Sequence, residues 1–149
     1  MTLGQAYFLI IVAAIGFVFS GKGFFESHFR KNAFGTVHSG PFGMYVWGDA
    51  AVLGIFWGIT ALFTLLVSDW ILFLLVFSIF WVVRSFGEMI YWFNEQHASK
   101  KRVNIKSKML YKYFHNDSVL FIYQLVQQCI LVVSIVASIY FSHIWLKQF

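Results

Sequence analysis

Apolar residues run along this chain in four long stretches that polar residues interrupt only rarely. Crossing about 30 Å of hydrocarbon takes about 20 mostly apolar residues in a helix. A backbone in lipid must pair its own polar groups, which over such a length only a helix achieves. The pattern therefore predicts an all-α membrane protein, with one four-helix transmembrane domain over 1–149. The predicted spans cover about 3–20, 44–67, 70–93 and 119–145.

The composition agrees with a lipid environment. Apolar residues make up 60% of the chain and charged residues only 11%, whereas soluble domains carry about 45–50% and about 25%. The net charge of +5 does not indicate a nucleic-acid-binding protein, because the basic residues gather between apolar stretches and do not cover one folded face. We expect the lipid bilayer as a partner, and no nucleic acid.

The basic residues predict the orientation of the spans. With four spans, the connections 21–43 and 94–118 lie on the same side of the membrane. They hold nine of the 11 Lys and Arg residues, whereas the opposite side has only Lys147. Because basic loops remain in the cytoplasm, we predict cytoplasmic long loops, both termini outside, and residence in the plasma (inner) membrane.

Both long connections also contain apolar residues at helical spacing. In the first, one face of a helix would carry Phe24, Phe25, His28 and Phe29, and the opposite face the charged residues. The stretch 103–118 has a looser pattern of the same kind. These patterns predict short amphipathic helices in the membrane interface, with lysines attracted to anionic lipid headgroups.

Charged and amide side chains interrupt three of the spans at similar depths. Counting 1.5 Å per residue from the predicted cytoplasmic ends places Asp49 and Glu88 about 8 Å deep and Arg84 one turn further in. The fourth span brings glutamines to the same third of the bilayer, namely Gln124, Gln127 and Gln128. Intramembrane charges cost about 2.5–3.5 kcal/mol and usually face protein or water. We therefore predict that these six residues form a site open to the cytoplasm.

Helical phase predicts which faces of the last two spans point inward. On the third span, a single stripe contains Phe77, Trp81, Arg84, Glu88 and Tyr91. On the fourth span, the face that carries the glutamines continues through Ser134 and Ser138. A polar and small-residue stripe of this length is expected to face protein and not lipid.

Small residues also predict a close helix contact. Gly54 and Gly58 have the GxxxG spacing that lets two helix backbones approach each other. Their partner is either a second copy of the chain or the first span, which offers Gly16 and Ser20 at the matching spacing.

Two interpretations of the charged residues follow from their spacing. Arg84 and Glu88 are four residues apart, so they can form a structural ion pair within one helix. Asp49 then leaves one carboxylate more than the arginine can neutralise. Such an imbalance favours a site that takes up a proton or another cation.

The other residue types give weaker signals. The five histidines lie in loops or near a span end without metal-binding spacing, and a single cysteine, Cys129, cannot form an intrachain disulfide. We expect no metal and no cofactor. The glycines around Pro41 predict a plain turn before the second span, with a re-entrant approach to the membrane as the alternative.

Three functions remain after these considerations. The leading hypothesis is a small transporter or ion-channel-like protein that forms a homo-oligomer through Gly54 and Gly58. The alternative is a non-catalytic subunit or scaffold of a larger membrane complex. The third is a lipid-headgroup-modifying enzyme that uses Asp49 and Glu88 as acid and base, although a non-enzymatic role is favoured.

Overall fold

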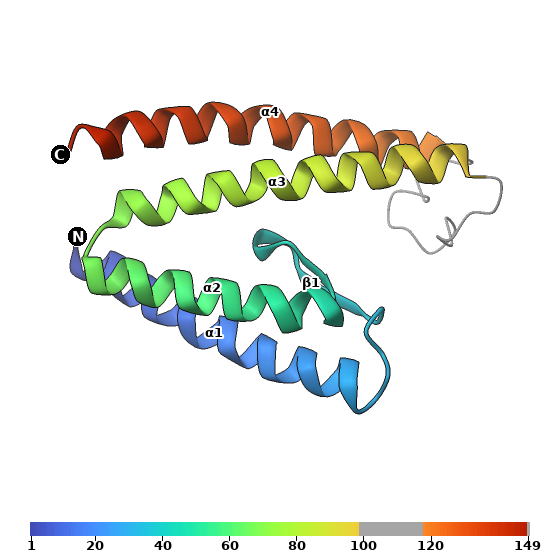
Figure 1. The fold of residues 1–149 in the computed structure, drawn as a ribbon, viewed down its shortest axis with the longest axis horizontal. Helices are drawn as coiled ribbons and strands as arrows, with labels where there is room; N and C mark the ends of the chain where they lie inside the picture. Colours follow the sequence, from blue (N-terminus) through green and yellow to red (C-terminus); the bar gives the residue numbers. More distant parts are fainter. Residues whose placement is uncertain (99–117, 149) are drawn as a thin grey trace. The chain divides into compact units, whose positions relative to one another are not determined.

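The computed structural model describes residues 1–98 and 118–148. Its four long helices are α1 (Leu3–His28), α2 (Trp47–Val67), α3 (Trp70–His97) and α4 (Ser118–Leu146) (Figure 1). Each is long and apolar enough to cross a membrane, so the prediction of four membrane-spanning helices is confirmed at that level. Between α1 and α2 lies a small hairpin made of β1 (Thr36–Ser39), the 3₁₀ turn η1 (Gly40–Phe42) and β2 (Met44–Val46).

The first helix is longer than the apolar stretch that predicts it. It continues past residue 20 to His28, so the segment around Phe24 forms the last turns of α1 and is not a separate helix. The turn after the helix contains a left-handed Lys31 (φ 51°), and the next amide, that of Asn32, donates to the carbonyl of Glu26 over 3.0 Å. This hydrogen bond pairs a carbonyl that the end of the helix leaves open. The amphipathic stretch 103–118 falls mostly outside the described residues.

Two compact units divide the chain. The first unit, Met1–Val76, contains α1, the hairpin, α2 and the first residues of α3. The second unit, Phe77–Gln148, contains the rest of α3 together with α4. The connection between α2 and α3 is as tight as the sequence predicts. Ser68 adopts a left-handed conformation at the end of α2, and the carboxylate of Asp69 accepts a hydrogen bond from the amide of Leu72 at 3.0 Å.

The first unit is built on direct backbone contact between α1 and α2. A Cβ atom added to Gly16 would lie 2.7 Å from the carbonyl oxygen of Gly54, and one added to Gly54 would lie 2.5 Å from that of Gly16. Gly58 lies against the ring of Phe17. Ser20 adds a hydrogen bond, because its hydroxyl donates to the carbonyl of Ala51 over 2.9 Å. In this structure α1 occupies the GxxxG face of α2.

The contact extends one further turn through Gly23. A Cβ atom there would lie 2.5 Å from the backbone nitrogen of Ala51 and 2.8 Å from the carbonyl oxygen of Trp47. Gly16 and Gly23 are seven residues apart, close to two helical turns, so they share one face of α1. The two backbones therefore lie in close contact from Gly23 to Gly16, and the ring of Phe17 covers Gly58 at the far end.

Trp57 connects α2 to the hairpin and to the start of α3. Its side chain is fully buried (0% exposed), and its indole nitrogen donates to the carbonyl of Phe42 at 3.0 Å. Its ring meets that of Phe42 edge-on at 5.8 Å and that of Phe73 at 6.2 Å. A buried tryptophan needs a partner for its N–H group, and the hairpin supplies it. Figure 1 shows the hairpin folded back along α2.

The glycine contact predicts opposite effects for two alanine substitutions in α1. Gly16→Ala should destabilise the protein by about 1–3 kcal/mol, the usual cost of forcing extra atoms into a packed site. Gly21→Ala should be neutral or stabilising by up to about 1 kcal/mol, because alanine favours a helix and nothing lies within 4 Å of that position. Thermal unfolding in detergent measures both changes, and equal melting temperatures would contradict the packing.

Candidate polar site on α3 and α4

Arg84 and Glu88 form an ion pair one helical turn apart on α3. A terminal guanidinium nitrogen of Arg84 lies 3.0 Å from Oε1 of Glu88, and the two side chains are 24% and 17% exposed. The spacing of four residues makes this contact possible within a straight helix. Because most of both side chains is covered, solvent screens the pair less than it would a surface pair.

Aromatic and amide contacts hold α3 against α4 at one end of the second unit. The rings of Trp92 and Tyr123 stack with centroids 4.9 Å apart. One turn further along α3, the amide of Gln96 donates to the side-chain oxygen of Gln124 at 2.6 Å. Trp81 and Ser134 line the same groove. Trp81 lies eleven residues before Trp92 on α3, and Ser134 lies eleven residues after Tyr123 on α4. The two helices therefore run antiparallel with one register over this length.

A seven-residue repeat of buried residues appears on both helices. The buried positions are Ser78, Ser85 and Trp92 on α3, and Leu120, Gln127 and Ser134 on α4. Residues seven apart stay on one face of a helix, and the Trp92–Tyr123 stack shows that the α3 face is turned toward α4. We call these six residues, with Tyr123, the α3–α4 seam.

Gln127 brings an amide to the level of the ion pair. It lies four residues beyond Tyr123, and Glu88 lies four residues before Trp92, so the common register places Gln127 and Glu88 at one height. Gln127 is only 7% exposed. Its side-chain oxygen is buried and has no hydrogen-bond partner within the part of the chain that the structure describes. An unsatisfied buried acceptor of this kind costs about 1–3 kcal/mol.

Ser85 adds a second buried oxygen near this level. Its side chain is fully buried (0% exposed), and its hydroxyl has no hydrogen-bond partner among residues 1–98 and 118–148. Ser85, Glu88 and Trp92 are spaced three and four residues apart, so they share one face of α3. Ser85 and Gln127 of the seam, together with Glu88, thus provide a hydroxyl, an amide carbonyl and a carboxylate within about two helical turns.

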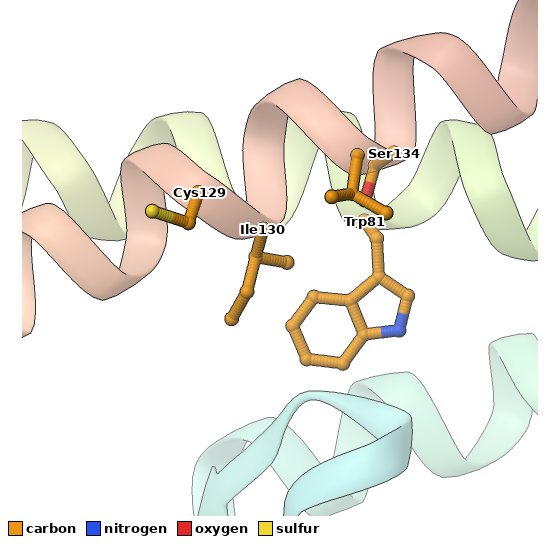
Figure 2. Close-up of a pocket in the computed structure, with 5 residues that line it drawn as sticks. Trp81, Cys129, Ile130 and Ser134 are labelled. Carbon is orange, nitrogen blue, oxygen red and sulfur yellow. The ribbon is translucent and has the colours of Figure 1, made fainter.

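An apolar groove lies further along the same two helices. It has a volume of about 330 Å³ and is lined by Trp81, Cys129, Ile130, Val133 and Ser134. Figure 2 shows Trp81 projecting from α3 toward the groove beside Ile130 and Ser134. The exposed lining is apolar, so this groove does not provide a polar binding site.

Asp49 lies in the first unit and has a local role there. It occupies the first turn of α2, where the N-cap residue Val46 makes no side-chain cap. Its carboxylate accepts a hydrogen bond from the backbone amide of Tyr45 at 3.2 Å. The N-terminus of a helix favours a negative charge. Asp49 therefore stabilises the start of α2, a role that counting charges along the spans did not suggest.

The structure brings together only some of the predicted site residues. Arg84, Glu88, Gln124 and Gln127 lie on the facing helices of the second unit, whereas Asp49 belongs to the first, so its approach to Arg84 stays a prediction. Gln128 is half-buried and is turned about 100° away from Gln127. Ser138 donates its hydroxyl to the carbonyl of Ser134 at 2.8 Å.

The sequence analysis did not predict several residues of this region. Gln96 and the buried Glu95 lie beyond residue 93, where the third span was drawn to end, although α3 continues to His97. Tyr91, predicted to face inward, is 42% exposed, whereas Trp92 is buried. The spacing of Ser78, Ser85 and Trp92 was the available signal, but serine at seven-residue intervals is a weak one.

Comparisons with known proteins do not add to these observations. No model of a known protein family matches the chain, and neither a curated protein nor a solved structure matches it significantly.

Among residues 1–98 and 118–148, no three His, Cys, Asp or Glu residues are grouped so that they could hold a metal ion.

The ion pair predicts strong coupling between its two members. Arg84→Leu or Glu88→Leu alone should lower stability, because each leaves one covered charge unpaired. The double substitution should recover most of the loss, with a coupling energy of about 0.5–3 kcal/mol in a double-mutant cycle. Unfolding in detergent supplies the four free energies.

The Glu26–Arg30 pair is the matched control for this cycle. It has the same spacing and the same 3.0 Å distance, but the Arg30 side chain is 64% exposed. Its coupling should therefore stay within about 0–1 kcal/mol. Equal coupling energies for the two pairs would show that burial does not distinguish them.

Proposed function

We propose that the protein is a small membrane transporter or channel-like protein, with a polar site open to the cytoplasmic side. The site would contain Asp49, Arg84, Glu88, Gln124, Gln127 and Gln128. One observation carries the proposal. The buried oxygen of Gln127, without a partner in the described chain, lies at the height of the Glu88 carboxylate on the facing helix.

The arrangement suits a solute that offers hydrogen-bond donors or positive charge. The oxygens of Gln127 and Ser85 can accept hydrogen bonds or coordinate a small cation, and Glu88 supplies negative charge. Such a solute offsets the cost of burying the unpartnered oxygens, about 1–3 kcal/mol each. A proton or a small monovalent cation that competes with Arg84 for Glu88 fits this chemistry best.

The alternative function is a non-catalytic subunit of a larger membrane complex. It is supported by the local partners of the charged residues, because Arg84 pairs with Glu88 and Asp49 accepts from Tyr45. Polar groups with such local partners need no solute to compensate them. This alternative predicts a stable partner after mild extraction, and full assembly with Asp49→Asn and Glu88→Gln.

Sidedness and assembly belong to the same proposal. Both termini would lie outside, the connections 21–43 and 94–118 would face anionic lipid in the cytoplasm, and the membrane would be the plasma (inner) membrane. A homo-oligomer would use a surface other than Gly54 and Gly58, because Gly16 and Phe17 already cover those glycines.

Flux through proteoliposomes tests the transport function. The wild-type protein should carry protons or small monovalent cations, and Glu88→Gln and Gln127→Leu should each reduce the rate about tenfold, as expected for losing contacts worth about 1.5 kcal/mol. Glu26→Gln is the matched control, since Glu26 pairs with Arg30 at the end of α1. Its rate should equal that of the wild type. No flux across a broad panel of ions would reject the proposal in favour of the subunit.

A further inference from the structure

The hairpin between α1 and α2 reaches far along a helix that is apolar enough to span the membrane. Trp57 follows the first residue of α2 by ten positions, about 15 Å at 1.5 Å per residue. Side chains of a helix lean toward its N-terminus. The carbonyl of Phe42, which binds the indole of Trp57, therefore lies about 10–15 Å below the start of α2.

Charged side chains mark the level at which α2 leaves the hydrocarbon. The ammonium of Lys22 lies 4.9 Å from the centre of the Trp47 ring, and Glu26 and Arg30 follow at the end of α1. Lysine and tryptophan are typical of the boundary between lipid and water. Measured from this level, the turn at Pro41 and Phe42 enters the span and does not remain above it.

Non-helical backbone at such a depth requires a special environment. The sheet has only two strands in the described chain, so each strand pairs along one edge and leaves its outer edge without a strand partner. Hydrocarbon cannot satisfy those groups, and irregular backbone within a membrane occurs only where protein covers it or where it lines a water-filled cavity.

Asp49 places a charged group at the open end of the hairpin. It lies at the base of the hairpin, bound to the amide of Tyr45, and within about 80° of Trp57 around α2. Gly54 and Gly58, which face α1, lie about 140° and 180° from it. Asp49 follows Trp47 by two positions, about 3 Å along the helix, so its carboxylate lies just below the boundary level and favours water at the open end of the hairpin. Pro41, at the turn, is exposed.

We infer that the hairpin is a re-entrant segment that lines a water-filled vestibule, open on the side of the membrane where α1 ends. The vestibule admits water and small hydrophilic solutes along the face of α2 that carries Asp49 and Trp57. It concerns the first unit alone, and it holds whether or not the α3–α4 seam binds a solute.

Cysteine accessibility tests this inference in oriented vesicles. Cys129, the only cysteine of the chain, is first replaced in Cys129→Ser, and single cysteines are then placed by Pro41→Cys, Phe34→Cys and Ile59→Cys. Phe34 is 92% exposed, before the hairpin, and Ile59 is 58% exposed on α2 just beyond Trp57. A charged, membrane-impermeant maleimide is applied to one side or the other.

The expected pattern separates water from lipid at the same depth. Pro41→Cys should react within about tenfold of the Phe34→Cys rate and only from the same side, whereas Ile59→Cys should react at least about 100-fold more slowly, because a thiol in hydrocarbon does not form the reactive thiolate. Slow labelling of Pro41→Cys, matching Ile59→Cys, would overturn the vestibule. So would rapid labelling of both, since this half of α2 would then lie outside the membrane.

Hydrogen exchange of the wild-type protein in lipid nanodiscs gives a second measurement that needs no substitution. Outer-edge amides of residues 36–46 should exchange while those of residues 55–64 in α2 remain protected, because water reaches only the former. Protection of the entire hairpin to the same degree as α2 would overturn the inference, even if Pro41→Cys failed to fold.

Discussion

Backbone contact between α1 and α2 is the constraint on which the first unit depends. Lipid chains are as apolar as leucine, so the hydrophobic effect does not drive two helices together within a membrane, and close packing must do so. Gly16, Gly23 and Gly54 permit that packing because a Cβ atom at any of them would overlap the other backbone. The contact also assigns the faces of α2. With α1 on the glycine side, the side that carries Asp49 and Trp57 is left for the hairpin.

In the second unit, different residues hold two apolar helices together. Instead of glycines, α3 and α4 use the Trp92–Tyr123 stack and the Gln96–Gln124 hydrogen bond. Larger side chains make this contact, and polar groups lie among them. Hydrogen bonds between membrane helices contribute only about 0.6 kcal/mol on average. A seam that contains Gln127 and Ser85 is therefore less tightly specified than the glycine contact.

Length and hydropathy were sufficient to predict the four helices, because both depend on the bilayer and not on tertiary contacts. The extension of α1 to His28 was not predictable from hydropathy, since charged residues end an apolar stretch without ending a helix. Glycine spacing identified the contact face of α2, but two partners had the right pattern, and only the packing of Gly16 against Gly54 distinguishes them. The fold of the hairpin depends on Trp57 and Phe42, fifteen residues apart, and no local signal links them.

The charges of the candidate site could also be predicted only in part from the sequence. Spacing alone predicted the Arg84–Glu88 pair, and counting charges then made Asp49 an excess acid. This count omits the N-terminus of α2, which carries about half a positive charge. It also omits the amide of Tyr45, which donates to the Asp49 carboxylate. Asp49 is thus partly compensated without Arg84. The two acids therefore have different surroundings. Glu88 pairs with Arg84 near the α3–α4 seam, whereas Asp49 lies at a helix end and accepts from the amide of Tyr45.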